Sequence, residues 1–122
     1  MPRSGGITQA LGQTGEAIAL NYLRRQKYAI AETRFRFLRG EIDIIARDRD
    51  TLVFIEVKMR RSCAFGKPEE SVTPVKQQQI RKVAEGYLLT HRLERAACRF
   101  DVIAIRPDGR AGYVLRHFKN AF

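Results

Sequence analysis

Long apolar runs are absent from this sequence of 122 residues. No apolar run exceeds four residues, as at positions 52–55 and 102–105, whereas a membrane-spanning helix needs about 20. Residues 1–6 also lack the apolar segment of a signal peptide. We therefore expect a cytoplasmic protein with no membrane partner.

Cysteine and histidine are scarce, with two residues of each. Cys63 and Cys98 form no CxxC motif, and His91 and His117 do not complete a zinc-binding spacing with them. Few cysteines without a paired motif are typical of a reducing compartment. We expect no structural zinc site, both cysteines in buried or loop positions, and no ligating companion for either histidine.

Acidic residues are outnumbered, with 13 Asp and Glu against 23 Lys and Arg, which gives a net charge of +10. This excess favours a polyanionic partner, either nucleic acid or an acidic membrane surface. Neither predicted helix has a strongly basic face opposite an aromatic one, so nucleic acid is preferred. The length and the 44% hydrophobic content fit a single domain at 8–122 after a flexible lead at 1–7.

Hydrophobic periodicity predicts two helices and five strands. The first helix is expected at 8–27 with Thr8 as its N-cap, and the second from Thr73 and Pro74 to about His91. The strands are expected at 28–37, 41–47, 51–60, 99–106 and 112–118. The first three pair antiparallel across short turns, and the second helix carries a crossover to a parallel strand. The predicted class is α/β, a mixed β-sheet flanked by helices.

Strand alternation assigns side chains to faces. In the strand at 51–60, one face carries Val53, Ile55, Val57 and Met59, and the other carries Leu52, Phe54, Glu56 and Lys58. In the strand at 41–47, Ile42, Ile44 and Ala46 are expected on one face, and Glu41, Asp43 and Ile45 on the other.

Several acidic residues fall on faces that are otherwise apolar. Glu56 does so, and a carboxylate there needs a partner or a metal. Lys58 projects from the same face, and Asp43, with Glu41 on its own face, is expected beside Glu56. Glu16 lies on the apolar stripe of the first helix.

Converging carboxylates raise one another's pKa unless a cation lies among them. Oxygen ligands of this kind suit Mg²⁺ or Mn²⁺, and phosphodiester hydrolysis uses such ions to activate water and stabilise the leaving oxygen. Glu56 and Lys58 alone would also fit an exposed ion pair. The addition of Asp43 and Glu16 favours the catalytic interpretation.

The same residues resemble a known family when taken as an ordered set. Gly12-x-x-Gly15-Glu16, Gly40-Glu41-Ile42-Asp43 and Val53-Phe54-Ile55-Glu56-Val57-Lys58 are similar to motifs of the YraN family of predicted bacterial nucleases. That family is placed in the restriction-endonuclease-like PD-(D/E)xK superfamily, and its pattern is similar to that of archaeal Holliday junction resolvases. The resemblance implies an α-β-β-β-α-β core, here followed by a terminal strand.

The resemblance also implies roles for individual residues. Asp43 matches the metal-binding Asp, Glu56 the second acidic ligand and Lys58 the catalytic Lys. The Val57 carbonyl is implied as a further metal ligand, and Glu16 as a helix-borne acid. Ile42 stands where the superfamily's name has Pro.

Basic residues around these acids are candidates for nucleic-acid binding. An extended chain projects Arg34 and Arg36 together, and the intervening Phe35 and Phe37 either stack on bases or enter the core. Further candidates are Arg60, Arg61 and Lys76. Asp101 either supports the site or forms a structural salt bridge.

The expected function is that of a Mg²⁺-dependent or Mn²⁺-dependent nuclease-like protein that binds nucleic acid, with DNA preferred. The alternatives are a catalytically silent nucleic-acid-binding module of the same fold and a small basic RNA-binding protein. A homodimer is compatible with the sequence, but no residue marks an interface.

Overall fold

Two helices and five strands form the described part of the chain. The computed structural model describes residues 7–60, 72–110 and 112–122, and of residues 7–14 only the backbone. The elements are α1 (Ile7–Arg25), β1 (Ala29–Phe37), β2 (Gly40–Asp48), β3 (Thr51–Met59), α3 (Pro74–Thr90), β4 (Ala97–Pro107) and β5 (Tyr113–Phe118). Every predicted helix and strand is therefore confirmed. The predicted flexible lead, Cys63 and Arg61 lie outside the described residues, except that Ile7 begins α1.

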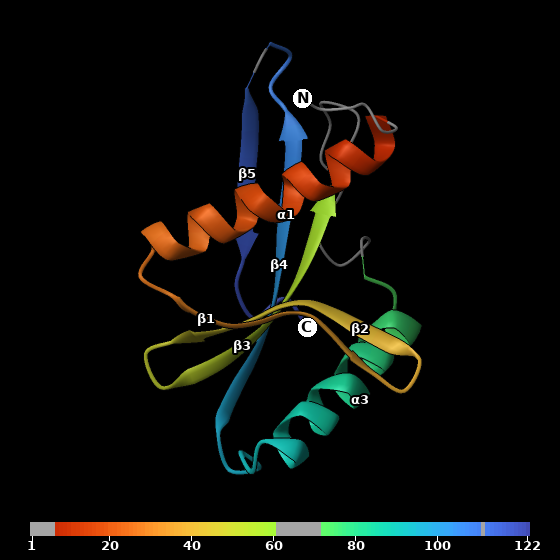
Figure 1. The fold of residues 1–122 in the computed structure, drawn as a ribbon, viewed down its shortest axis with the longest axis vertical. Helices are drawn as coiled ribbons and strands as arrows, with labels where there is room; N and C mark the ends of the chain where they lie inside the picture. The colour runs from red at the N-terminus through yellow and green to blue at the C-terminus, as the bar shows by residue number, and fades with distance from the viewer. Residues whose placement is uncertain (1–6, 61–71, 111) are drawn as a thin grey trace.

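The strands form one sheet in the order β1-β2-β3-β4-β5. The first three strands pair antiparallel, β3 and β4 pair parallel, and β5 pairs antiparallel with β4. The predicted mixed sheet and the crossover through α3 are thus confirmed. The sheet is so strongly twisted that the β1–β2 hairpin runs across the direction of β4 and β5 (Figure 1).

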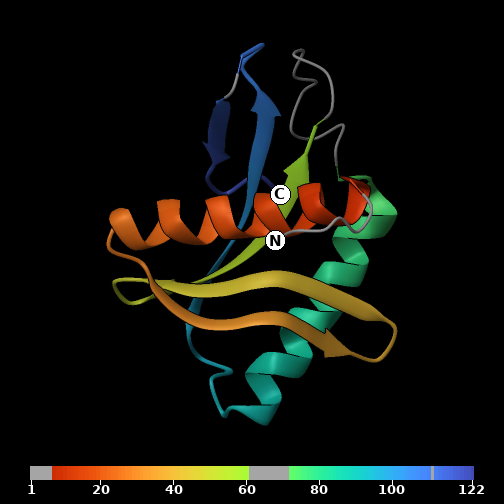
Figure 2. The same ribbon diagram turned by 45° about the horizontal axis from the view of Figure 1, so that its top comes forward.

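The helices cover opposite faces of this sheet, as Figure 2 shows. One face packs on α3 in a cluster, here called the α3 core, that consists of Ile42, Ile45, Leu52, Phe54, Val72, Ile80, Val83, Ala84, Tyr87 and Val102. The other face packs on α1 in the α1 core, which consists of Ala19, Leu23, Tyr28, Ile44, Ala46, Val53, Ile55, Ile103 and Ile105. No described helix is long and apolar enough to cross a membrane.

Near Arg34, the alternation of side chains between the two faces of the sheet is interrupted in the β1–β2 hairpin. Ile44 and Ala46 belong to the α1 core, but Ile42 belongs to the α3 core, so the prediction that all three share a face is wrong. Arg34 has a φ of 52°, in the left-handed region that interrupts the regular pleat. The pairing of β2 with β3 ends nearby, at Ile44 and Ile55.

Two smaller predictions are also corrected. Helix α1 begins at Ile7, so Thr8 lies inside its first turn instead of capping it. Cys98 is exposed because it lies near the start of β4, where the strand has not yet entered the sheet interior. The cap of α3 is as predicted: the Thr73 side chain accepts a hydrogen bond from the Lys76 backbone N–H at 3.2 Å, and Pro74 follows.

Gly86 lies where α3 meets the β1–β2 hairpin. A Cβ atom there would overlap the Phe37 ring. Glycine to alanine in a helix ordinarily stabilises by about 1 kcal/mol. We expect Gly86→Ala instead to lower the free energy of unfolding by about 1–3 kcal/mol, because Phe37 must move.

Urea unfolding of Gly86→Ala measures this effect. Gly86→Ala is expected to cost less free energy of unfolding in a Phe37→Leu background than in the wild type, because leucine is smaller than the phenylalanine ring. A rise in the free energy of unfolding in Gly86→Ala, as at an ordinary helix position, would contradict the close contact between Gly86 and the Phe37 ring.

Candidate active site

The predicted acidic residues stand where β2 and β3 separate. Regular pairing ends at Ile44 and Ile55, so Asp43 and Glu56 are the next residues beyond the last pair. The Asp43 carboxylate accepts a hydrogen bond from the Val57 backbone N–H at 2.8 Å. A side chain therefore replaces the ladder bond at this point, which we call the strand fork.

A cavity of about 210 Å³ opens at the strand fork. The residues that line it come from the β1–β2 turn, β2, β3 and α3: Arg39, Gly40, Glu41, Asp43, Glu56, Lys76, Gln79 and Ile80. We call this cavity the acid pocket. Asp43, Glu56 and Glu41 thus line one pocket, although the facing of β2 changes between Ile42 and Ile44.

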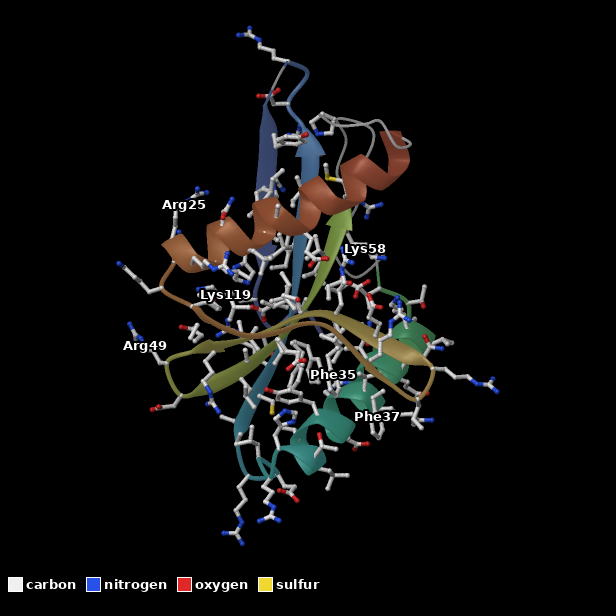
Figure 3. The ribbon with its side chains drawn as sticks, viewed as in Figure 1. Arg25, Phe35, Phe37, Arg49, Lys58 and Lys119 are labelled. Carbon is white, nitrogen blue, oxygen red and sulfur yellow. The ribbon has the colours of Figure 1, made fainter. Side chains whose placement is uncertain are left out.

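Glu56 lies between two lysines. Its side chain is 8% exposed, and its Oε2 lies 3.5 Å from Lys58 Nζ and 3.6 Å from Lys76 Nζ. Lys58 reaches Glu56 from the same strand face, on the side of the molecule where α3 begins (Figure 3). Lys76 comes from the first turn of α3. Both ammonium groups compensate the buried carboxylate.

Asp43 has the most perturbed carboxylate of the pocket. Burial raises its pKa and the charge of Glu56 raises it further, while the Val57 N–H lowers it, with a result of about 7. Glu41 adds to the rise and Lys76 opposes it. Asp43 is therefore partly protonated at neutral pH, and its ionised form needs more positive charge than the pocket provides.

These donors fit a hard divalent cation. The described residues contain no group of three or more His, Cys, Asp or Glu side chains arranged to hold a metal ion. Mg²⁺, however, is commonly held by one or two carboxylates, with water and substrate phosphate as its other ligands. Asp43 and Glu56 supply two such carboxylates, and the burial of Asp43 beside the Glu56 charge, which raises the Asp43 pKa, is an environment that a cation would relieve. The Val57 carbonyl as a ligand stays a prediction.

Glu16 is held apart from the acid pocket by Arg34. Its Oε1 accepts a hydrogen bond from Arg34 Nε at 2.9 Å. The pKa of Arg34 is raised mainly by Glu16, and also by Glu41 and Asp43. Arg34 therefore lies between the helix-borne acid and the strand fork, and Glu16 does not line the cavity with Asp43 and Glu56.

The other predicted nucleic-acid-binding residues are placed differently. Arg36 is 81% exposed and pairs with Glu41 at 2.9 Å. Arg60 follows β3, and its backbone N–H donates to the Ile105 carbonyl at 2.7 Å. Lys76 lies in the acid pocket rather than on an open face. Only Arg36 is thus presented mainly to solvent among these three.

Phe35 and Phe37 both pack against the α3 core. Phe35 meets Tyr87 edge to face, with ring centroids 5.1 Å apart, and both phenylalanines lie on the α3 side of the hairpin (Figure 3). The alternative in which both rings are free to stack on bases is therefore wrong for Phe35. Phe37 also lines a second cavity.

Helix α3 presents a polar edge to the strand fork; the sequence predicted Lys76 as a nucleic-acid contact but not its place beside Asp43 and Glu56. Lys76, Gln79 and Ile80 line the acid pocket, and Gln79 and Val83 line the neighbouring cavity. Their spacing of three and four residues is that of one helix face. This periodicity in the sequence could have predicted that these side chains share one face of α3.

A second buried polar cluster lies on the α1 side of the sheet. The fully buried Asp101 accepts hydrogen bonds from Arg99 Nε at 2.9 Å and from the Asn120 backbone N–H at 2.9 Å. His117 Nε2 lies 2.7 Å from Asp101, and His117 Nδ1 lies 2.9 Å from the Tyr22 hydroxyl. His117 does have polar companions, and Asp101 forms the structural salt bridge that was one of its two predicted roles.

Ionised Asp43 is expected to destabilise the metal-free protein. Because its pKa is raised from 3.8 to about 7, its contribution to stability decreases as the pH rises through this range. We expect Asp43→Asn, which keeps an acceptor for the Val57 N–H, to raise the free energy of unfolding at pH 8 by about 1–2 kcal/mol.

Urea unfolding in EDTA at pH 5 and pH 8 measures this gain, which should be larger at pH 8. The exposed Asp50→Asn is a matched control with little expected change. A destabilisation of Asp43→Asn at pH 8 would show that the carboxylate is already compensated.

The fold and the strand fork together define a mixed α/β domain with a carboxylate and lysine pocket. The chain belongs to the uncharacterised protein family UPF0102, whose profile matches residues 15–105. This range contains Glu16, Asp43, Glu56 and Lys58.

Curated relatives match along almost their whole length. A UPF0102 protein of Geotalea uraniireducens (strain Rf4) is 52% identical over 114 residues, which cover 93% of this chain and 90% of the relative. One from Chlorobium limicola (strain DSM 245 / NBRC 103803 / 6330) is 48% identical over 118 residues, covering 93% and 92%. One from Trichlorobacter lovleyi (strain ATCC BAA-1151 / DSM 17278 / SZ) is 44% identical over 123 residues, covering 100% and 97%.

Proposed function

We propose that this protein is a divalent-metal-dependent nuclease that hydrolyses phosphodiester bonds, with DNA as its preferred substrate. The observation that carries the proposal is the acid pocket, where Asp43 and Glu56 meet at the strand fork with Lys58 and Lys76 beside Glu56. The net charge of +10 supports a polyanionic substrate. The α-β-β-β-α-β order also suits the restriction-endonuclease-like fold that the resemblance implies.

The pocket residues have separable roles in this proposal. Asp43, Glu56 and the Val57 carbonyl would hold Mg²⁺ or Mn²⁺, which when bound supplies Lewis acidity and lowers the pKa of water. Lys58, whose ammonium group lies 3.5 Å from Glu56, orients the attacking water. Lys76 and Arg39, at the same pocket, attract the phosphate. Glu16, which pairs with Arg34 outside the acid pocket, takes no direct part.

Cleavage of labelled oligonucleotides tests the proposal. Duplex, single-stranded and four-way DNA are incubated with purified protein in Mg²⁺, in Mn²⁺ and in EDTA. Product that requires either metal is expected. The absence of product from every substrate in both metals would contradict the proposal.

One observation favours a second candidate, a catalytically silent nucleic-acid-binding module. Glu56 already has two lysines as counter-charges, so one of the three carboxylates that line the pocket is neutralised without any metal. This candidate predicts binding that is unchanged between Mg²⁺ and EDTA, with no product. Tighter binding to structured RNA than to DNA at matched salt would instead favour an RNA-binding protein.

A further inference from the structure

A second, larger cavity adjoins the acid pocket. Its volume is about 590 Å³, within the range of about 300–1,000 Å³ that is typical of ligand sites. Its apolar wall consists of Phe37, Leu38 and Val83, and we call it the apolar pocket. Arg39, Gly40 and Gln79 line both cavities. The two pockets therefore adjoin along the β1–β2 turn and α3.

Leu38 is placed in this turn against the usual preferences of a folded chain. It is 80% exposed, and its φ of 56° lies in the left-handed region, where Gly or Asn is favoured. Folding alone gives no advantage to a large apolar side chain at such a position. A bulky residue that is both exposed and strained is an indication of binding.

We propose that the apolar pocket accepts an unpaired nucleobase of the strand whose phosphate reaches the acid pocket. This inference rests on the proposed function and specifies its substrate class: nucleic acid with an unpaired base next to the scissile phosphate. Phe37 and Leu38 contact the face of the base, and Arg39 and Lys82 attract the phosphates on either side.

Charge and proximity select this occupant over others. Arg39 and Lys82 are the charged residues among those that line the apolar pocket, which suits a chain of phosphates rather than a cationic peptide. The pocket also shares Arg39, Gly40 and Gln79 with the site proposed for phosphodiester hydrolysis. Base stacking on aromatic and apolar side chains does not depend on sequence, so the expected preference is for unpaired structure.

The Phe37 ring is fixed in its place before any base arrives. It lies against the α3 backbone at Gly86, where a Cβ atom would overlap it. Gly40, which begins β2, is similarly close to Val83. A wall made of groups held in this way loses little conformational entropy when a base binds.

Two duplexes of equal length test the inference, one fully paired and one with a single unpaired 2-aminopurine. Binding is measured by anisotropy in EDTA at fixed salt, and base insertion by quenching of 2-aminopurine fluorescence. Wild-type protein is expected to bind the bulged duplex about tenfold more tightly, within the range of about 1–3 kcal/mol per stacked base.

Leu38→Asn is the informative variant because asparagine tolerates a positive φ, so the turn is preserved. It is expected to reduce the preference to less than about threefold and to weaken quenching, with duplex affinity unchanged. Leu89→Gln removes another exposed leucine, 61% exposed on α3, and should retain the preference.

Three outcomes would overturn the inference: equal affinity for both duplexes, an unchanged preference in Leu38→Asn, or self-association of the wild type that Leu38→Asn abolishes. The last would assign the pocket to a second copy of the chain. Cleavage of the same duplexes in Mn²⁺ separates this inference from the proposed function. Base preference without cleavage contradicts only the nuclease activity, and cleavage without base preference contradicts only the base pocket.

Discussion

Glu56→Gln is expected to reduce metal-dependent cleavage at least about a thousandfold, in line with the loss of a group that stabilises charge in the reaction. The substitution keeps the shape of the side chain but removes the negative charge that lies between Lys58 and Lys76. Because Glu56 is one of the two carboxylates proposed to hold the metal ion, its loss removes a negatively charged ligand. Circular dichroism and thermal unfolding should show a folded protein.

Lys58→Met is expected to have a comparable effect on cleavage for a different reason. It retains an apolar stem but removes the ammonium group that lies 3.5 Å from Glu56 and that is proposed to orient water. Metal binding should persist in this variant, whereas Glu56→Gln should weaken it. This difference separates a ligand from a residue that acts on the nucleophile.

Lys119→Met provides the matched control. Lys119 is exposed and lies well away from Lys58 in Figure 3, so its cleavage rate should stay within about twofold of wild type unless surface charge alone controls the reaction. Cleavage by Glu56→Gln or Lys58→Met at wild-type rates would remove these residues from the mechanism.

Asp101→Asn is expected to destabilise the protein by about 3–5 kcal/mol, the usual cost of breaking a buried ion pair. Asp101 is fully buried and accepts hydrogen bonds from Arg99 and the Asn120 N–H, with His117 2.7 Å away. An asparagine amide places a donor against donors from Arg99 and His117. For a chain of this size the melting temperature should fall by roughly 10–20 °C.

The pH dependence of unfolding gives this prediction a second readout. Burial alone would raise the pKa of Asp101, but hydrogen bonds from His117, Arg99 and the Asn120 N–H outweigh it and hold the pKa below 3.8. A lowered pKa in the folded state stabilises the protein above the unfolded value, and this contribution is lost as the pH falls below about 3.8. The free energy of unfolding of Asp101→Asn should therefore decrease less on acidification than that of the wild type.

The surface variant Asp50→Asn, at an exposed position, should match wild type within about 0.5 kcal/mol. A melting temperature of Asp101→Asn close to wild type would show that the buried network contributes little to stability. In that case Arg99 and His117 must find other hydrogen-bond partners in the variant.

The sequence was sufficient for the elements because each has a strong local signal. The alternation of Val53 and Ile55 with Leu52 and Phe54 specified β3, and Thr73 with Pro74 specified the start of α3. The position of Glu56 on an apolar face followed from the same alternation. The position of Glu56 next to Asp43 followed from the short turn that joins two antiparallel strands.

The remaining features depend on tertiary structure. The positive φ of Arg34 turns the hairpin over, and no residue preference for arginine signals it. Lys76 reaches Glu56 from α3, a helix that packs closely against the β1–β2 hairpin where Gly40 meets Val83 and Gly86 meets Phe37. Tyr22 and His117 meet across 95 residues of sequence, a separation beyond the reach of local patterns.

Anomalous diffraction from crystals soaked in Mn²⁺ tests whether a divalent cation binds between Asp43 and Glu56. We expect one manganese peak within coordination distance, about 2.0–2.3 Å, of an oxygen of each carboxylate. The same peak should be missing in Asp43→Asn crystals. Saturating Mn²⁺ with no peak at the strand fork, or with Lys58 and Lys76 still the only cations at Glu56, would show that these carboxylates do not hold a metal ion.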